Sequence, residues 1–186
     1  MGTTAAVVLA AGGGRRFEGE GHKLLAPFRG STVVTQAVQA AVDAGLDEVV
    51  VVVGAIDVRA VLPAGVTVVD NPRWAEGQAT SLQVARQAVA AAGHDAMVVG
   101  LGDQPLIEPA AWAAVAASTS PIAVATYDGQ RRNPVRLAEE VWPLLPSEGD
   151  EGARSLIRGR SDLVEAVPCP GTPVDIDTQE DLRRWS

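Results

Sequence analysis

The sequence has few of the residues that particular classes of protein require. Among 186 residues it has a single cysteine, Cys169, which excludes an intrachain disulfide and a cysteine-based zinc cluster. Basic residues number 15 against 23 acidic ones, giving a net charge of −8. That balance argues against a protein whose main role is to coat nucleic acid or an anionic membrane. A small phosphorylated ligand stays open, because a few cations and backbone N–H groups can hold a phosphate chain.

Long apolar segments are also absent from the sequence. No apolar run approaches the roughly 18 residues of a membrane span, and the first residues lack the basic region of a secretory signal. We therefore expect a soluble cytoplasmic protein that has neither nucleic acid nor membrane as a partner. The length predicts one domain over residues 1–186.

Lysine is nearly absent. Fourteen of the fifteen basic residues are arginine, and Lys23 is the only lysine in the chain. In a composition tilted this far toward arginine, a retained lysine hints that its compact ammonium is needed.

What the sequence does contain is an alternation of strand and helix patterns. Short Val-rich runs that suit buried parallel strands occupy residues 5–9, 48–53, 66–69, 96–101 and 122–125. Helical spacing of apolar residues occupies 31–44, 80–92, 108–117 and 178–185. This alternation predicts a three-layer α/β/α domain with a mainly parallel sheet. Residues 129–134 and 143–152 are turn-rich, and we interpret this later region as an elaboration on the ligand side of the sheet.

A glycine-rich loop follows the first predicted strand. Residues 12–14 are all glycine, and Arg15, Arg16 and Lys23 add positive charge. A loop of this kind at the carboxyl end of a strand predicts a phosphate or nucleotide site, because glycines let backbone N–H groups approach phosphate oxygens. It fits neither the P-loop nor the dinucleotide pattern, since Leu24 follows Lys23 and no helix pattern begins before Ser31.

Acidic residues end two of the predicted strands. Asp103 follows the buried run 98–102, where a carboxylate is well placed to hold Mg²⁺. Asp175 and Asp177 end a second predicted strand over 173–177, and one of them could be a further ligand. Alternation along a strand puts both on one face, so the sequence does not choose between them.

The segment 70–81 runs into a predicted helix start. We expect Thr80 and Ser81, with free backbone N–H groups at that helix start, to form a seat for a phosphate or oxyanion. A plain helix cap is an equal alternative for Thr80.

Several of these segments together resemble one known family. The loop from Leu9 to Phe17, followed by Lys23-Leu24-Leu25-Ala26-Pro27, resembles the loop of the MobA-like NTP transferases. Matches to further motifs of that family lie in order along the chain, at residues 71–81, 102–105, 133–135, 149–154 and 175–182. The chain departs from the pattern by about two extra residues between Phe17 and Lys23, and Asn133 replaces the usual histidine.

The resemblance implies a Rossmann-like nucleotidyltransferase fold and a Mg²⁺-dependent reaction. It implies catalytic roles for Lys23, Arg16 and Asp103, with Mg²⁺ on Asp103 and on Asp177 or Asp175. The nucleotide-binding residues that it implies are Leu9, Ala10, Ala11, Gly12, Gly13, Gly14, Lys23, Asn71, Gly77 and Ser81. The acceptor-binding residues that it implies are Thr80, Ser81, Asn133, Pro134, Asp150 and Arg154.

The resemblance also implies a reaction. Its partners would be CTP or another NTP and a phosphorylated pterin, and Ala11 is typical of the cytidylyl branch. The expected activity is transfer of CMP from CTP to the terminal phosphate of molybdopterin, with release of pyrophosphate and delivery to a molybdoenzyme or its chaperone. Three alternatives are guanylyl transfer to the same acceptor, cytidylyl transfer to another phosphate acceptor such as methylerythritol phosphate, and a non-catalytic molybdenum cofactor carrier or chaperone.

Overall fold

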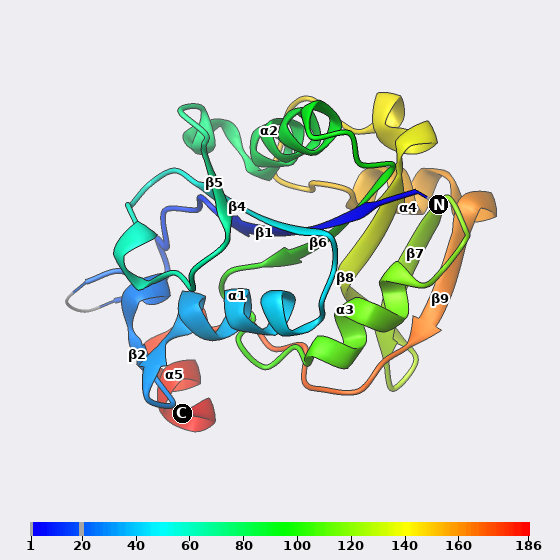
Figure 1. Cartoon of the computed structure of the whole chain (residues 1–186). Helices are drawn as coiled ribbons and strands as arrows, with labels where there is room; N and C mark the ends of the chain where they lie inside the picture. Colours follow the sequence, from blue (N-terminus) through cyan, green and yellow to red (C-terminus); the bar gives the residue numbers. More distant parts are fainter. Residues whose placement is uncertain (1, 19–20) are drawn as a thin grey trace.

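A seven-stranded sheet forms the centre of the protein in a computed structural model that describes residues 2–18 and 21–186 (Figure 1). Its order is β5-β4-β1-β6-β8-β7-β9. The strands are β1 Thr4–Ala10, β4 Glu48–Val53, β5 Thr67–Asp70, β6 Ala96–Leu101, β7 Ile122–Tyr127, β8 Gln130–Ala138 and β9 Val164–Pro168. A separate small pair joins β2 Pro27–Phe28 to β3 Ser31–Thr32.

The sheet is parallel except at one strand. β1 pairs in parallel with β4 on one side and β6 on the other, so that Val7 lies between Val50 and Val99. β8 runs antiparallel to both of its neighbours, β6 and β7. The carboxyl ends of β1, β4 and β6 therefore meet at one edge of the sheet, where parallel α/β proteins bind their ligands.

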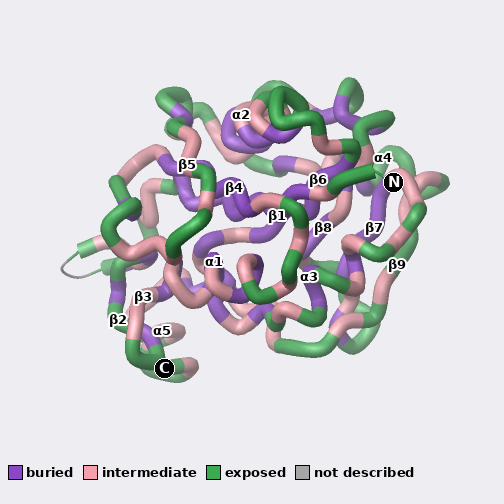
Figure 2. The backbone as a smooth tube through the Cα atoms, in the orientation of Figure 1, coloured by how far each residue is buried: buried purple, intermediate pink, exposed green. Residues whose placement is uncertain are grey.

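Helices cover both faces of the sheet. The helices are α1 Val33–Asp43, α2 Gln78–Ala91, α3 Pro109–Ala116, α4 Arg154–Gly159 and α5 Gln179–Trp185. Side chains of β1 alternate between two core clusters: Val7 packs in the same cluster as Leu82 of α2, and Val8 in the same cluster as Val38 of α1. The central strands β1, β4 and β6 are buried between these layers (Figure 2). The predicted three-layer α/β/α arrangement with a mainly parallel sheet is confirmed.

Helix boundaries depart from the prediction by a few residues. α1 begins at Val33 because Thr32 caps it, accepting a hydrogen bond from the Thr35 N–H at 3.3 Å. α5 begins after Thr178, which forms a reciprocal capping box with Asp181. α2 begins two residues earlier than its apolar spacing predicts, directly after Gly77.

Two sequence interpretations of the later part of the chain are wrong. The strand predicted over 173–177 does not form, and Gly171 makes only an isolated bridge with Ile107. The turn-rich segment 129–134 belongs mostly to β8, whose pairing with β7 shifts between Val124 and Ala125. Pro134 lies at this irregularity. Proline has no N–H to donate to a neighbouring strand, so it is accommodated where the pairing is interrupted.

A third small cluster attaches the chain's end to its beginning. Ile176 is fully buried and packs with Phe17, Phe28 and Val33. This packing brings the 175–178 segment beside the glycine-rich loop. Over the described parts of the chain, no helix has both the length and the apolar character to cross a membrane.

Candidate functional site

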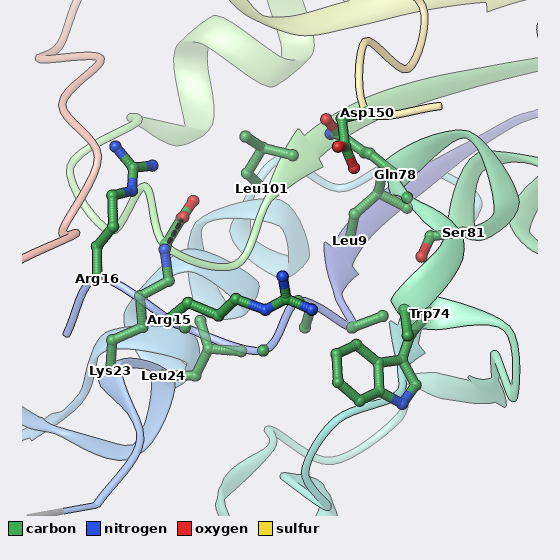
Figure 3. A pocket seen from close by; sticks show the side chains of 18 residues that line it. Leu9, Arg15, Arg16, Lys23, Leu24, Trp74, Gln78, Ser81, Leu101 and Asp150 are labelled. Carbon is green, nitrogen blue, oxygen red and sulfur yellow. Dashed lines mark hydrogen bonds and ion pairs between the residues drawn. The ribbon is translucent and has the colours of Figure 1, made fainter. Parts of the chain in front are cut away.

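The glycine-rich loop leaves the carboxyl end of β1 and borders a cavity of about 450 Å³ (Figure 3). Gly14 has a φ of 62°, a conformation that favours glycine, and its carbonyl accepts from the Phe17 N–H at 3.0 Å. A Cβ on Gly12 would meet no atom within 4 Å, whereas one on Gly13 would lie 3.0 Å from the Trp74 ring. The loop thus presents bare backbone to the cavity on one side and packs against an aromatic ring on the other.

His22 joins this loop to the turn that carries Lys23. Its Nδ1 accepts a hydrogen bond from the Leu24 N–H at 3.2 Å, and its Nε2 lies 3.0 Å from the Gly12 carbonyl oxygen. An imidazole that accepts at Nδ1 and donates at Nε2 is neutral. Burial, assisted by the Lys23 charge, lowers the pKa of His22 and favours that neutral form.

Two carboxylates and two cations meet at the end of the cavity. Lys23 Nζ lies 2.6 Å from Asp103 Oδ2 and 2.7 Å from Asp177 Oδ1, and Arg16 Nη2 lies 2.8 Å from Asp177 Oδ2. The Lys23 side chain is 12% exposed, whereas that of Arg16 is 77% exposed. Burial alone would lower the pKa of Lys23, but the Asp103 and Asp177 carboxylates outweigh it, and the net pKa is raised. The ammonium is therefore charged at neutral pH.

Asp103 is fixed by backbone contacts on both sides. The Gly102 N–H donates to the Leu9 carbonyl at 2.9 Å, and the Ile176 N–H donates to the Asp103 carbonyl at 2.9 Å. Its Oδ1 is buried and has no hydrogen-bond partner among the residues that the structure describes. A buried carboxylate oxygen without a partner destabilises the folded protein unless a cation or a hydrogen-bond donor binds it.

This donor set fits a divalent cation whose remaining ligands come from a substrate. No group of three or more His, Cys, Asp and Glu side chains placed to hold a metal occurs in residues 2–18 and 21–186. Mg²⁺ commonly uses one or two carboxylates and completes its shell with water and phosphate oxygens. Asp103 and Asp177 supply that number, and the unpartnered Oδ1 of Asp103 offers a free ligand atom.

Asp175 has a different partner from Asp177 and joins a chain of neutral amides. Gln104 Nε2 donates to Asp175 Oδ1 at 2.9 Å, and Asn133 Nδ2 donates to Gln104 Oε1 at 3.0 Å. Burial and the nearby Asp103 carboxylate raise the pKa of Asp175. Asp175 and Asp177 therefore have different partners, and Asp177 is the one that shares Lys23 with Asp103.

The opposite wall of the cavity comes from the segment before α2 and from its first turns. Figure 3 shows Trp74, Gln78 and Ser81 facing Lys23, Arg15 and Arg16 across the cavity. Sequence reasoning assigned no role to Gln78, and it included Trp74 only as part of the motif at residues 71–81. The spacing of apolar residues that identifies the helix carries no signal for which of its polar side chains face a cavity.

Asn71 lies behind this wall rather than in it. It is 1% exposed, and its amide donates to the hydroxyls of Thr80 at 2.9 Å and Ser81 at 2.8 Å. Its Oδ1 accepts from the Arg73 N–H at 2.9 Å, which fixes the orientation of the amide. Asn71 and Thr80 border a second cavity, and of these three residues Ser81 alone lines the first.

The free N–H groups expected near Thr80 are engaged. The Thr80 N–H donates to the Gly77 carbonyl at 3.2 Å, and the Ala79 N–H donates to the Gly149 carbonyl at 2.9 Å. The Thr80 hydroxyl also lies 2.8 Å from the Gly77 carbonyl. The helix start is thus capped by the chain itself, because the 149–152 turn docks onto it.

The other predicted site residues divide between the cavity and its surroundings. Those that line the cavity are Leu9, Ala10, Ala11, Gly12, Gly13, Gly14, Arg16, Lys23, Gly77, Ser81, Asp103 and Asp150. Pro134 is buried within β8, and Arg154 is exposed at the first residue of α4. Gln104, which sequence reasoning left without a role, connects the site to Asn133.

Comparisons with known proteins agree with this geometry. A model of the MobA-like NTP transferase domain matches residues 6–166. Nicotine blue oxidoreductase of Paenarthrobacter nicotinovorans is 32% identical and covers 96% of this chain and 94% of that protein. A nucleotidyl transferase from Methanothermobacter thermautotroptrophicus is 27% identical with a TM-score of 0.83, over 98% of this chain and 95% of that one. Rv0371c of Mycobacterium tuberculosis, in a complex with manganese, is 29% identical with a TM-score of 0.79, over 98% and 97%.

Proposed function

Since this chain belongs to the MobA-like NTP transferase family, we propose that it transfers CMP from CTP to the terminal phosphate of molybdopterin. The observation that carries the proposal is the meeting of three features at one cavity. These are a loop of three glycines, a buried lysine beside two carboxylates, and a buried carboxylate oxygen without a partner. Together they supply backbone donors and cations for a triphosphate and oxygen ligands for its metal ion.

In the proposed reaction an oxygen of the acceptor phosphate attacks the α-phosphorus of CTP. The bond from the α-phosphorus to the bridging oxygen of the β-phosphate breaks, and pyrophosphate leaves with that oxygen. Such reactions depend mainly on positioning and charge neutralisation. Lys23 and Arg16 neutralise the phosphates, while the backbone of Gly12 and Gly14 lies along them. Asp103 and Asp177 would hold Mg²⁺, which supplies further neutralisation of the phosphate charge.

The acceptor side of the proposed site offers neutral amides, whereas the phosphate side offers cations. Asn133, Gln104 and Asp175 form a hydrogen-bonded chain beside Asp103 and offer amide groups rather than cations. Amides that are oriented by their neighbours can recognise the donors and acceptors of a pterin ring. The choice of CTP rests on Ala11, because an alanine at this position is typical of the cytidylyl branch of the family.

A second candidate function follows from one relative. Nicotine blue oxidoreductase is similar to this chain over nearly its whole length. A reductase using the same cavity would bind a reduced dinucleotide in place of a triphosphate. The loop lacks the glycine pattern and the immediate helix of dinucleotide sites, and a carboxylate pair, Asp103 and Asp177, lies beside it. We therefore place nucleotidyl transfer first.

A thermal-shift panel separates these functions. CTP, GTP, ATP and UTP with Mg²⁺ are compared with NADH and NADPH, because a ligand that binds the native state raises its melting temperature. We expect the largest increase with CTP and Mg²⁺, and release of pyrophosphate only when molybdopterin is added. Stabilisation by NADH or NADPH alone, with oxidation of the reduced nucleotide, would instead support a reductase.

Three outcomes concern the remaining alternatives. Pyrophosphate release with methylerythritol phosphate but not with molybdopterin would reassign the acceptor, and release with GTP would reassign the nucleotide. Stabilisation by the pterin with no turnover on any nucleotide would favour a carrier of the cofactor. Asp103→Ala is the matched control, because it should retain the fold and lose turnover.

A further inference from the structure

The two carboxylates at the cavity are already neutralised by the protein itself. Lys23 contacts one oxygen of each, at 2.6 Å from Asp103 and 2.7 Å from Asp177, and Arg16 contacts the second oxygen of Asp177. Two cations and two anions make this group electrically neutral. The two carboxylates are only 18% and 19% exposed, so bulk water does little to replace the lysine as their partner.

A divalent cation would compete with Lys23 for these atoms. The oxygens that face Lys23 are the ones on which the carboxylates converge, since they lie within 2.7 Å of a single nitrogen. A lysine ammonium and a metal ion repel each other at such short range. Both therefore cannot hold the same pair of oxygens.

Lys23 also has an alternative place to go. It stands at the start of the short 3-10 turn Lys23–Leu25 and lines the cavity of about 450 Å³ that the glycine loop borders. Its four-carbon stem can swing the ammonium toward that cavity without moving the backbone. His22, bound to Gly12 and to the Leu24 N–H, holds the turn in place while the side chain moves.

From this geometry we infer that Lys23 is an internal counter-ion that alternates with the divalent cation. In the ligand-free protein it holds Asp103 and Asp177 together. A metal ion that takes the carboxylates releases the ammonium into the cavity, where it meets the phosphates of a nucleotide. Metal and nucleotide then strengthen each other's binding, and the free protein binds metal alone weakly. The inference builds on the proposed function in taking this cavity as the phosphate site.

The single lysine allows a direct test on the wild-type protein. Lysine labelled with ¹³C at Cε gives one side-chain NMR signal in this chain, because no other lysine is present. Mg²⁺ is added without nucleotide while the signal is followed, and binding is measured independently by Mn²⁺ electron paramagnetic resonance. We expect the Lys23 signal to shift and to saturate together with metal binding. A metal that binds while the signal stays unchanged, for example at Asp103 Oδ1 alone, would overturn the inference.

A variant keeps the test decisive if the wild type binds metal too weakly to saturate. Lys23→Met removes the competing charge, so we expect nucleotide-free Mn²⁺ to bind at least about tenfold more tightly than to the wild type. Equal or weaker binding by Lys23→Met contradicts the inference. The matched control is Arg59→Met, which also leaves two aspartates, Asp57 and Asp70, without their shared cation. This control should leave the Mn²⁺ affinity unchanged.

The two proposals fail in distinguishable ways. The NMR and Mn²⁺ measurements contain no nucleotide, so they can succeed even where no NTP binds and no pyrophosphate is released. Conversely, turnover with CTP and an immobile Lys23 signal would retain the proposed function and remove the counter-ion role.

Discussion

The two halves of the sheet hold their polar groups in different ways. In the half made by β5, β4, β1 and β6, the polar groups of the site are charged and gather where parallel strands end, as Lys23 and Asp103 do. In the half made by β8, β7 and β9, contact with the site runs through amides: Asn133 of β8 donates to Gln104, the residue after Asp103, and Gln104 donates to Asp175. The first half is suited to phosphate charge, and the second is suited to the shape and hydrogen bonding of an acceptor. Changes in the two halves should therefore affect different kinetic parameters.

The largest effect is expected in the charged half. Asp103→Asn keeps the shape of the side chain but removes the charge that holds Lys23 and a metal ion. Turnover should fall by about a thousandfold or more, since metal-assisted charge neutralisation is worth several kcal/mol in such reactions. Pyrophosphate release measures this loss, and circular dichroism checks that the fold persists.

A matched aspartate shows whether position or charge alone matters. Asp70 also ends a parallel strand, β5, but pairs with Arg59 at the surface, 2.6 Å away. Asp70→Asn should leave turnover within about twofold, because an exposed ion pair contributes little. An equal loss in both variants would mean that the effect of Asp103 is not specific to the site.

The next effect is expected in the chain of amides that connects Asn133 of β8 to Asp175, which we call the amide half. Gln104→Leu removes the link between Asn133 and Asp175 and leaves both without a buried partner. Because an unsatisfied buried group costs about 1–3 kcal/mol, the KM for the acceptor should rise by about tenfold. The Kd for the nucleotide should stay within about twofold of the wild-type value, and the difference between the two constants is the informative measurement.

A second glutamine serves as the control for this variant. Gln83 bonds to the carbonyls of Leu145 and Pro146, at 3.3 and 3.0 Å, and does not line the cavity at the glycine-rich loop. Gln83→Leu should change neither constant. If Gln104→Leu weakened the nucleotide instead of the acceptor, the assignment of the amide half to the acceptor would be wrong.

A smaller effect is expected where the loop is joined to the lysine. His22→Ala removes two hydrogen bonds, one to Gly12 and one from Leu24. With about 1 kcal/mol for each bond, offset by water in this half-exposed place, nucleotide Kd should rise by about fivefold. His22→Asn, which keeps a donor and an acceptor, should recover part of the affinity. Calorimetry with nucleotide and Mg²⁺ tests both variants, and equal affinities for Ala and Asn would contradict the positioning role.

Sequence reasoning succeeded where the signal was local and failed where it was not. The Val-rich strands, the placement of the glycine loop after β1 and that of Asp103 after β6 follow from residues that are adjacent in the chain. β8 was missed because its first half is polar and exposed, and Arg131 and Arg132 resemble turn residues. That Asp177 rather than Asp175 shares Lys23 with Asp103 could not be foreseen, because it depends on contacts between residues far apart in the chain.

The smallest expected effect concerns stability at the border between the two halves. Burial, reinforced by Asp103, raises the pKa of Asp175, so the folded protein binds its proton more tightly than the unfolded chain does. Stability therefore falls as the pH rises from the ordinary aspartate pKa through the raised one, and the loss persists at neutral pH. Asp175→Asn keeps an oxygen that accepts from Gln104 and removes the ionised form. We expect a higher melting temperature at pH 7 and a difference from the wild type that shrinks as the pH approaches 3.5. Metal-free thermal melts across this pH range measure it, and a lower melting temperature at pH 7 would mean that the Asp175 charge stabilises the fold.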